Sequence, residues 1–380
     1  MKESSLISYA AALFVSLFPL QAVALFAYGF DPTTPGFYGF RTDQKGNFTA
    51  LANTPFGGNV YYGAMIADTK SDALYVYDAS EDNPSIQSYK VDTDGNPTLV
   101  YTLPYTPPSV PDTFSSVYLP LISPSGKDIY VVNVYTPPGE LSYTTIITVL
   151  SIQKNGSITY DPNEGYDLNG GVQAIAEDPS GKFIFGCLGT ENYTFGYSVA
   201  EDGSLTAIAC PQLPDGAVAG TLGFGPQGKY LYEFFQITNE SPQLAVYRVE
   251  NNGALSAIPG SPFSDSQGRF NCDSEFVVDP NSKFAYALGT IESVPTTGIY
   301  AFQFESDGRL TPISGSPYSL VQKYAIETVI LMNPGGNFIT VNSGFSDNWV
   351  FEVQPNGALK ERENSPSPNI PAINCFVGSK

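Results

Sequence analysis

The hydrophobic and polar residues of this chain alternate in short runs, which are separated by polar turns that contain glycine. The clearest runs are residues 244–249 (Leu-Ala-Val-Tyr-Arg-Val) and 299–304 (Ile-Tyr-Ala-Phe-Gln-Phe). Alternation over four to eight residues is typical of a half-buried β-strand. No helical periodicity of useful length follows the first 24 residues. The pattern therefore predicts an all-β protein.

One glycine turn recurs seven times, each time between two strand-like runs. Its glycines are Gly46, Gly95, Gly156, Gly203, Gly253, Gly308 and Gly357. Successive copies are 49, 61, 47, 50, 55 and 49 residues apart. A period of about 40–50 residues is the length of one four-stranded propeller blade. The repeat predicts a seven-bladed β-propeller of antiparallel blades, with this turn between the third and fourth strands.

A second turn recurs six times out of phase with the first. In most copies proline stands second and glycine late, which presets one backbone angle and allows a positive φ. We place this turn between the first and second strands of a blade. Its copies occupy residues 68–71, 123–127, 178–182, 225–229, 279–283 and 333–337.

The missing seventh copy indicates how the ring closes. Residues 373–380 resemble a first strand that runs into a turn, and residues 25–30 resemble a second strand. We expect the C-terminal strand to join the N-terminal blade. Main-chain hydrogen bonds would then link the two ends of the ring and remove two exposed edges.

The first 24 residues match a secretory signal peptide. Lys2 precedes an apolar run at residues 10–18, and Ala22-Val23-Ala24 fits the small-x-small cleavage rule. The apolar run is too short for a bilayer core of about 30 Å. We predict a signal peptide at 1–24, a single propeller domain at 25–380 and no membrane span after cleavage; an uncleaved anchor is the alternative. The expected location is secreted, periplasmic or cell-surface.

The net charge of −20 argues against nucleic acid as a partner, because an acidic surface repels phosphate backbones. Such a charge keeps an exported protein soluble, and it also attracts cations or basic partners. We expect a monomer.

The chain has no histidine. This excludes Ser-His-Asp and Cys-His catalysis and every histidine-ligated metal centre. Asp92-x-Asp94-Gly95 resembles part of a calcium loop. Because the same position in the other six blades is an ordinary glycine turn, we predict a turn there, and no metal or cofactor.

Four cysteines leave the disulfide pairing open. Cys187 and Cys210 should lie two strand spacings apart, about 9–10 Å. That separation exceeds the limit of about 7 Å between Cα atoms for a disulfide.

The candidate site lies where connections from a fourth strand to the next first strand surround the channel. Carboxylates crowded there can have raised pKa values and act as a base, while arginine or lysine holds an anion. The alternative is a solvated rim of mutual salt bridges. The charged residues on these connections are Asp112, Asp215, Arg269, Asp273, Glu275, Lys323 and Glu327.

The repeated blade motif consists of Asp-Pro-x-Gly-Lys before an aromatic strand, followed later by x-Asp-Gly-x-Leu-Thr. This motif resembles that of the lactonase-type seven-bladed propellers. That family includes 6-phosphogluconolactonase and carboxymuconate-cyclising enzymes, and it is grouped with Tyr-Val-Thr-Asn repeat surface propellers. The resemblance covers residues 25–380. It implies lactonase chemistry based on channel His, Arg and acidic residues, and a Gly-Pro-Arg-His stretch ahead of a first strand. Residues 171–174, 218–221 and 272–275 stand at that place without Arg-His.

Two functions follow. In the first, the protein is a non-catalytic exported propeller that binds a small molecule, such as a sugar acid or lactone, or a protein at its channel face. In the second, it is a sugar-lactone hydrolase of the 6-phosphogluconolactonase type. Glu275, Asp273 or Glu327 would then activate water, and Arg269 or Lys323 would hold the substrate.

Overall fold

The computed structural model describes residues 25–378 with several gaps, so the predicted signal peptide lies outside the described residues. The gaps are residues 31–33, 59–62, 69, 81–82, 107–114, 137–142, 161–164, 190–191, 239, 266, 273, 292–295, 321–327, 344–347, 364 and 367–369.

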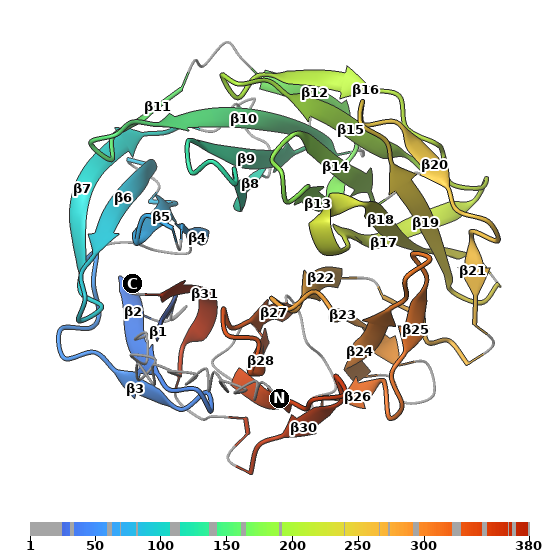
Figure 1. Ribbon diagram of the computed structural model, residues 1–380. Helices are drawn as coiled ribbons and strands as arrows, with labels where there is room; N and C mark the ends of the chain where they lie inside the picture. Colours follow the sequence, from blue (N-terminus) through green and yellow to red (C-terminus); the bar gives the residue numbers. More distant parts are fainter. Residues whose placement is uncertain are drawn as a thin grey trace, which may run out of the picture.

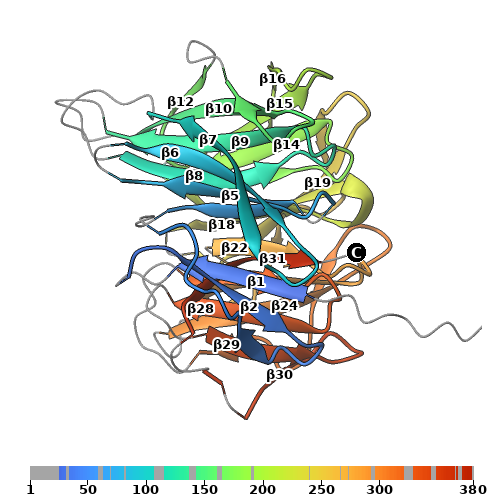
Figure 2. The same ribbon diagram turned by 90° about the vertical axis from the view of Figure 1, so that its left-hand side faces the viewer.

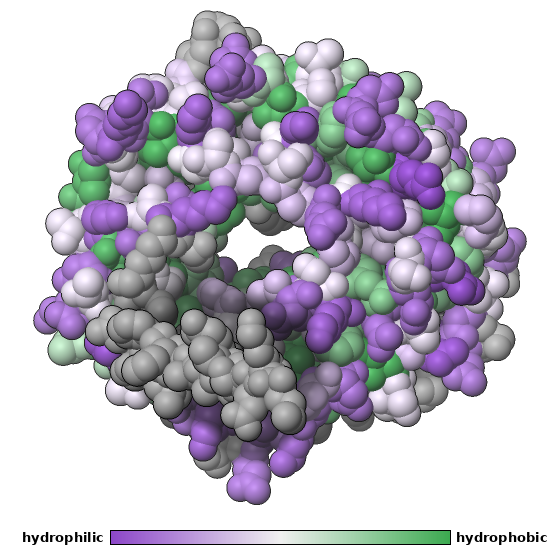
Figure 3. All heavy atoms as spheres, viewed as in Figure 1, coloured by the Kyte–Doolittle hydropathy of each residue, from purple (hydrophilic) through white to green (hydrophobic). Residues whose placement is uncertain are grey.

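The described strands form seven antiparallel sheets arranged as blades around a central opening (Figure 1). Each sheet has one strand at the opening and its fourth strand at the rim. Figure 3 shows the opening in a space-filling view, with several hydrophilic residues at its border. The prediction of a seven-bladed propeller with four-stranded blades is confirmed.

In each of the first four blades the strands follow one another from the opening to the rim. The first blade comprises β31 (Ala372–Gly378), β1 (Leu25–Phe30), β2 (Phe37–Thr42) and β3 (Phe48–Ala50). The second comprises β4 (Met65–Asp68), β5 (Ala73–Asp78), β6 (Ser85–Val91) and β7 (Pro97–Pro104). The third comprises β8 (Ser115–Ile122), β9 (Asp128–Tyr135), β10 (Thr144–Ile152) and β11 (Ile158–Thr159), with β12 (Gly165–Asn169) also on β10. The fourth comprises β13 (Val172–Glu177), β14 (Phe183–Leu188), β15 (Thr194–Val199) and β16 (Leu205–Ile208).

The last three blades continue in the same order. The fifth comprises β17 (Ala217–Phe224), β18 (Tyr230–Ile237), β19 (Gln243–Val249) and β20 (Leu255–Ala257), with β21 (Phe263–Ser264) also on β19 and a 3₁₀ turn, η1 (Pro226–Gly228). The sixth comprises β22 (Ser274–Val278), β23 (Phe284–Ile291), β24 (Thr296–Phe304) and β25 (Leu310–Pro312), with β26 (Tyr318–Ser319) also on β24. The seventh comprises β27 (Thr328–Met332), β28 (Phe338–Ser343), β29 (Asn348–Val353) and β30 (Leu359–Glu361).

The C-terminal strand closes the ring as the sequence predicted. β31 pairs antiparallel with β1, from Leu25 opposite Gly378 to Phe30 opposite Ala372. Figure 2 shows the two strands side by side. The blade that carries the N-terminal strands thus takes its innermost strand from the other end of the chain.

The core lies between neighbouring blades, where the faces of two sheets meet. Between the sixth and seventh blades, for example, Tyr286 and Leu288 pack in one cluster with Trp349 and Val341. All four side chains are at most 1% exposed. This interface is thus a layer of aromatic and aliphatic side chains, and the strand alternation in the sequence supplies it.

None of the four cysteines, all of which lie in described segments, is in a disulfide. Cys187 pairs across to Thr194 of the third strand, and Cys210 follows the fourth strand β16. The third strand therefore separates these two thiols. No helix long and apolar enough to cross a bilayer occurs in the part of the chain that the structure describes.

The recurrent glycine turn docks each blade on the blade before it. Its glycines have φ values between +74° and +94°, a region that favours glycine. A Cβ at Gly95 would lie 2.3 Å from the ring of Phe26 in the first blade. At all seven glycines the nearest atom to such a Cβ lies 2.3–2.9 Å away and belongs to the preceding blade.

In some of these turns a hydroxyl group of the preceding blade also binds the glycine carbonyl. The hydroxyl of Tyr28 donates to the carbonyl oxygen of Gly95 at 2.6 Å, and Tyr286 donates to Gly357 at 3.0 Å. Glycine is therefore favoured at these positions for two reasons: the turn needs a positive φ, and the preceding blade leaves no room for a Cβ atom.

We predict that Gly95→Ala lowers the free energy of unfolding by about 2–5 kcal/mol, from a left-handed alanine and an overpacked interface. Urea denaturation measures this loss. Gly216→Ala is the matched control, because Gly216 has φ +79° and no atom within 4 Å of its Cβ position. An equal loss at both positions would show that the blade contact contributes nothing.

Candidate functional site at the inner strands

Four of the inner strands carry a β-bulge beside the channel, at which one residue is skipped in the strand register. Register shifts on β13, β17, β22 and β31 place Gln173, Gly220, Glu275 and Asn374 at the bulges, where each is skipped in the Cα register with the second strand. In β13, β22 and β31 the bulge lies near the start of the strand, where the connection from the preceding blade enters. Bulges re-aim side chains and are frequent next to active sites.

Glu275 is the charged residue among these four, and its backbone has a positive φ of +32°. Its Oε2 accepts a 2.7 Å hydrogen bond from the backbone N–H of Ile330 in β27. The N–H of Asn333 donates to Phe338 in β28, so by alternation the N–H of Ile330 points to the opposite, channel-side edge. The carboxylate of Glu275 thus joins the inner strands of the sixth and seventh blades.

Burial raises the pKa of the Glu275 carboxyl to about 7, and the hydrogen bond from Ile330 opposes that shift only in part. A positive φ on a residue other than glycine is a strained conformation of the kind that clusters at functional sites. Glu275 therefore has the environment of a group that exchanges protons near neutral pH.

Arg269, which the sequence placed with Asp273 and Glu275, is bound to Asp265 instead. Its Nε and Nη2 donate to the two Asp265 carboxylate oxygens at 2.8 and 3.0 Å, and its backbone N–H donates to the same side chain at 2.9 Å. The hydrogen bonds from Arg269 hold the pKa of Asp265 below its usual range. Sequence reasoning missed Asp265, although its spacing of four residues from Arg269 could have indicated the pair.

The other predicted site residues contribute less to the described geometry. Asp215 is exposed, in the turn that ends where the N–H of Ala217 donates to the carbonyl of Pro214. The remaining four, Asp112, Asp273, Lys323 and Glu327, lie outside the described residues. Of the predicted residues, the described structure places Glu275 at the channel and binds Arg269 in a separate ion pair.

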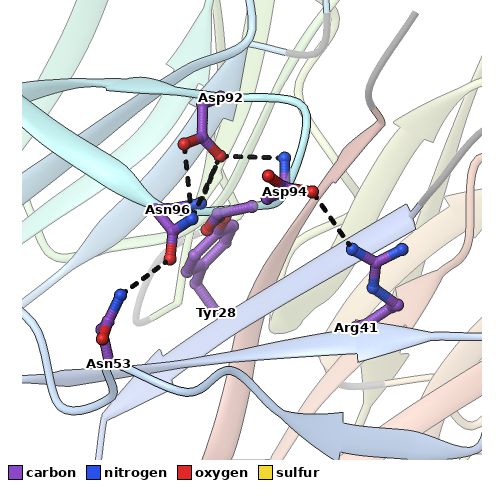
Figure 4. Close-up of polar contacts among 7 residues, drawn as sticks. Tyr28, Arg41, Asn53, Asp92, Asp94 and Asn96 are labelled. Atoms are coloured by element: carbon purple, nitrogen blue, oxygen red, sulfur yellow. Dashed lines mark hydrogen bonds and ion pairs between the residues drawn. The ribbon is translucent and has the colours of Figure 1, made fainter.

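The Asp92 side chain binds groups of its own turn, as in an ordinary glycine turn (Figure 4). Asp92 Oδ1 accepts from the backbone N–H groups of Asp94 and Asn96 at 2.9 and 2.8 Å, and these bonds hold the pKa of Asp92 low. Asp94 instead faces Arg41, 3.9 Å away. Within the described segments no three His, Cys, Asp or Glu side chains converge as metal ligands.

A second buried carboxylate, which the sequence did not single out, lies within a strand. Glu233 in β18 is 0% exposed, and its oxygens lie 2.8 and 3.0 Å from the hydroxyl of Thr194. Burial raises its pKa to about 7. The sequence could have indicated Glu233, because this glutamate lies between Tyr232 and Phe234 in an otherwise apolar second strand.

The family model for the seven-bladed β-propeller lactonases matches residues 31–365. The chain belongs to this lactonase family. Among curated proteins there is no significant match.

Solved structures of the same shape include relatives of the lactonase family. A periplasmic gluconolactonase from Pseudomonas aeruginosa is 17% identical with a TM-score of 0.66, and covers 94% of this chain and 99% of its own. A proposed 6-phosphogluconolactonase from Bacteroides uniformis is 15% identical with a TM-score of 0.67, and covers 94% and 100%. At these identities the likeness establishes the propeller fold.

We predict that stability falls as pH rises from about 4.5 to 7, in part because of Glu275. The pKa of Glu275 is higher in the folded state than in the unfolded chain. Its contribution to the free energy of unfolding is therefore complete below the unfolded-state pKa and is lost as pH rises through the folded-state pKa. In Glu275→Gln the loss of unfolding free energy over this pH range should be smaller by on the order of 2 kcal/mol. Urea denaturation at several pH values measures this loss. The exposed Asp215→Asn is the control, and an unchanged slope in Glu275→Gln would contradict the prediction.

Proposed function

We propose that this lactonase-family propeller is exported and binds a small molecule or a protein at its channel face without catalysing a reaction. One observation carries the proposal: Glu275 and Arg269, two of the three described charged residues of the candidate site, already have structural partners. Glu275 binds the N–H of Ile330, and Arg269 binds Asp265 through two guanidinium nitrogens. A group used in this way holds the inner strands in place and is less available to a substrate.

The chemistry of the side chains supports the same view. The family resemblance implies channel histidine and arginine, and this chain has no histidine. Sugar acids or lactones would fit as small ligands, because hydroxyl groups can bond to the unpaired backbone groups of inner-strand edges. A protein partner is the other occupant that an open channel face admits.

A sugar-lactone hydrolase is the second candidate, and the environment of Glu275 favours it. A carboxylate with a pKa near 7 can take a proton from water as that water attacks the lactone carbonyl. The ester C–O bond then breaks, the ring oxygen takes up a proton, and a hydroxy acid is released. The related structures named as gluconolactonases are consistent with this substrate class.

Proton release with gluconolactone and its 6-phosphate separates the two candidates. We expect the rate with the purified protein to equal spontaneous hydrolysis, whereas calorimetry detects binding of gluconate or 6-phosphogluconate if the ligand is a sugar acid. Glu275→Gln is compared with Glu250→Gln, an exposed carboxylate between β19 and β20. A rate well above background that only Glu275→Gln abolishes would overturn the non-catalytic proposal.

Export is a separate part of the proposal, supported by the apolar leader and by the periplasmic location in the name of one related structure. We expect the mature N-terminus to be Leu25. Mass spectrometry of the protein from a secreting host checks this, and a full-length product retained in the cytoplasm would contradict it.

A further inference from the structure

The interface between the third and fourth blades departs from the repeat at two positions. The residue that precedes the turn between first and second strands is Glu177 in the fourth blade. Its equivalents, aligned by strand register, are all apolar. They are Ala67, Ile122, Phe224, Val278, Met332 and Phe376.

The second departure faces the first across the same interface. The opening residue of the second strand is Asp128 in the third blade, and its equivalents are Ala73 or aromatic. The aromatic equivalents are Phe26, Phe183, Tyr230, Phe284 and Phe338. Asp128 is 6% exposed, and its carboxylate lies 2.9 Å from a Cβ position at Gly203 of the fourth blade. Two carboxylates thus replace two apolar groups at one blade contact.

A tyrosine hydroxyl lies in the same place without a protein partner. Tyr130 follows Asp128 by two residues in β9, so both side chains lie on the face that packs against the fourth blade. Its side chain is 0% exposed, and no described residue hydrogen-bonds its hydroxyl. The equivalent hydroxyls of Tyr28 and Tyr286 donate to a glycine carbonyl of the next blade.

Glu177 is also short of partners, because its Oε1 is buried and no described residue hydrogen-bonds it. The neighbouring Asp178 is already used, since it accepts from the backbone N–H groups of Ser180, Lys182 and Phe183. Asp128 accepts a long 3.5 Å bond from the hydroxyl of Ser151, and its carboxylate also interacts with the side chain of Ser123. Glu177, Asp128 and Tyr130 therefore bring oxygen atoms to the same interface, near enough for their charges to interact.

No lysine or arginine in the described segments is buried, so none of them balances these charges from within the interface. Lys127 lies beside Asp128 but is exposed, and the further acidic group Asp202 is exposed as well. Buried carboxylates in such a setting must take up protons or a cation.

We propose that Glu177, Asp128 and Tyr130 form a binding site for a hard divalent cation between the third and fourth blades. Oxygen ligands from two carboxylates and a hydroxyl suit such an ion, and water molecules complete its shell. The ion links β13 to β9 and neutralises the buried charges. The site is distinct from the channel site around Glu275, so it stands whichever of the two proposed functions is correct.

The test uses the metal-free protein, treated with chelator and titrated with CaCl2 or MgCl2 by calorimetry and thermal denaturation. We expect one site and a rise in melting temperature with cation concentration, because a ligand that binds only the folded state stabilises it. Binding should tighten from pH 6 to pH 8 and release protons, since the carboxyl groups must ionise first. Wild-type protein that binds neither cation at millimolar concentration would overturn the proposal.

Three variants localise the effect, and a fourth, Glu250→Gln, is the control. Glu177→Gln and Asp128→Asn keep the shape of the side chains and should weaken binding at least tenfold, while Glu250→Gln should bind like the wild type. Glu177→Met introduces the residue found at the equivalent position 332, so it should fold without the ion and lose the cation-dependent rise in melting temperature. Unchanged affinity in the Gln, Asn and Met variants would show that any cation binds elsewhere and would refute the assignment.

Discussion

The close approach of each glycine turn to the preceding blade is the contact on which the rest of this structure depends. A blade has an aromatic or aliphatic face that must be covered, and the next blade covers it. The turn at Gly95 comes near enough to Phe26 that a methyl group would not fit. Seven repetitions of this contact produce a ring, and the pairing of β31 with β1 closes that ring without leaving an open edge.

The same arrangement leaves the channel-side edges of the innermost strands without a neighbouring strand, and the candidate site lies at these edges. An innermost strand has no neighbour on its channel side, so some of its N–H groups need other partners. Glu275 supplies one such partner, for the N–H of Ile330. The bulge brings its side chain to the edge, and burial there raises the pKa of Glu275. The geometry that lets this carboxylate hold two strands together is therefore the same geometry that would suit it to proton transfer.

Departures from the repeat are the most informative positions in a propeller. Most equivalent residues serve the same packing role in each blade, so a carboxylate in an apolar column has no packing explanation. Glu177 and Asp128 are two such departures, and they meet at a single interface beside the hydroxyl of Tyr130. Glu233 is a third, held by Thr194 of the neighbouring blade.

The sequence by itself determined the architecture, because turn glycines and strand alternation are local and repeat with a fixed period. It therefore predicted the blade number, the two kinds of turn, the closing strand and the separation of Cys187 from Cys210. It also predicted Glu275 as a candidate base. Only the tertiary structure decided the partners across blades: that Glu275 reaches Ile330 of the next blade, and that Glu177 and Asp128 lie at one interface. These contacts join residues of neighbouring blades, whose distances depend on bulges and blade packing that a linear pattern does not encode.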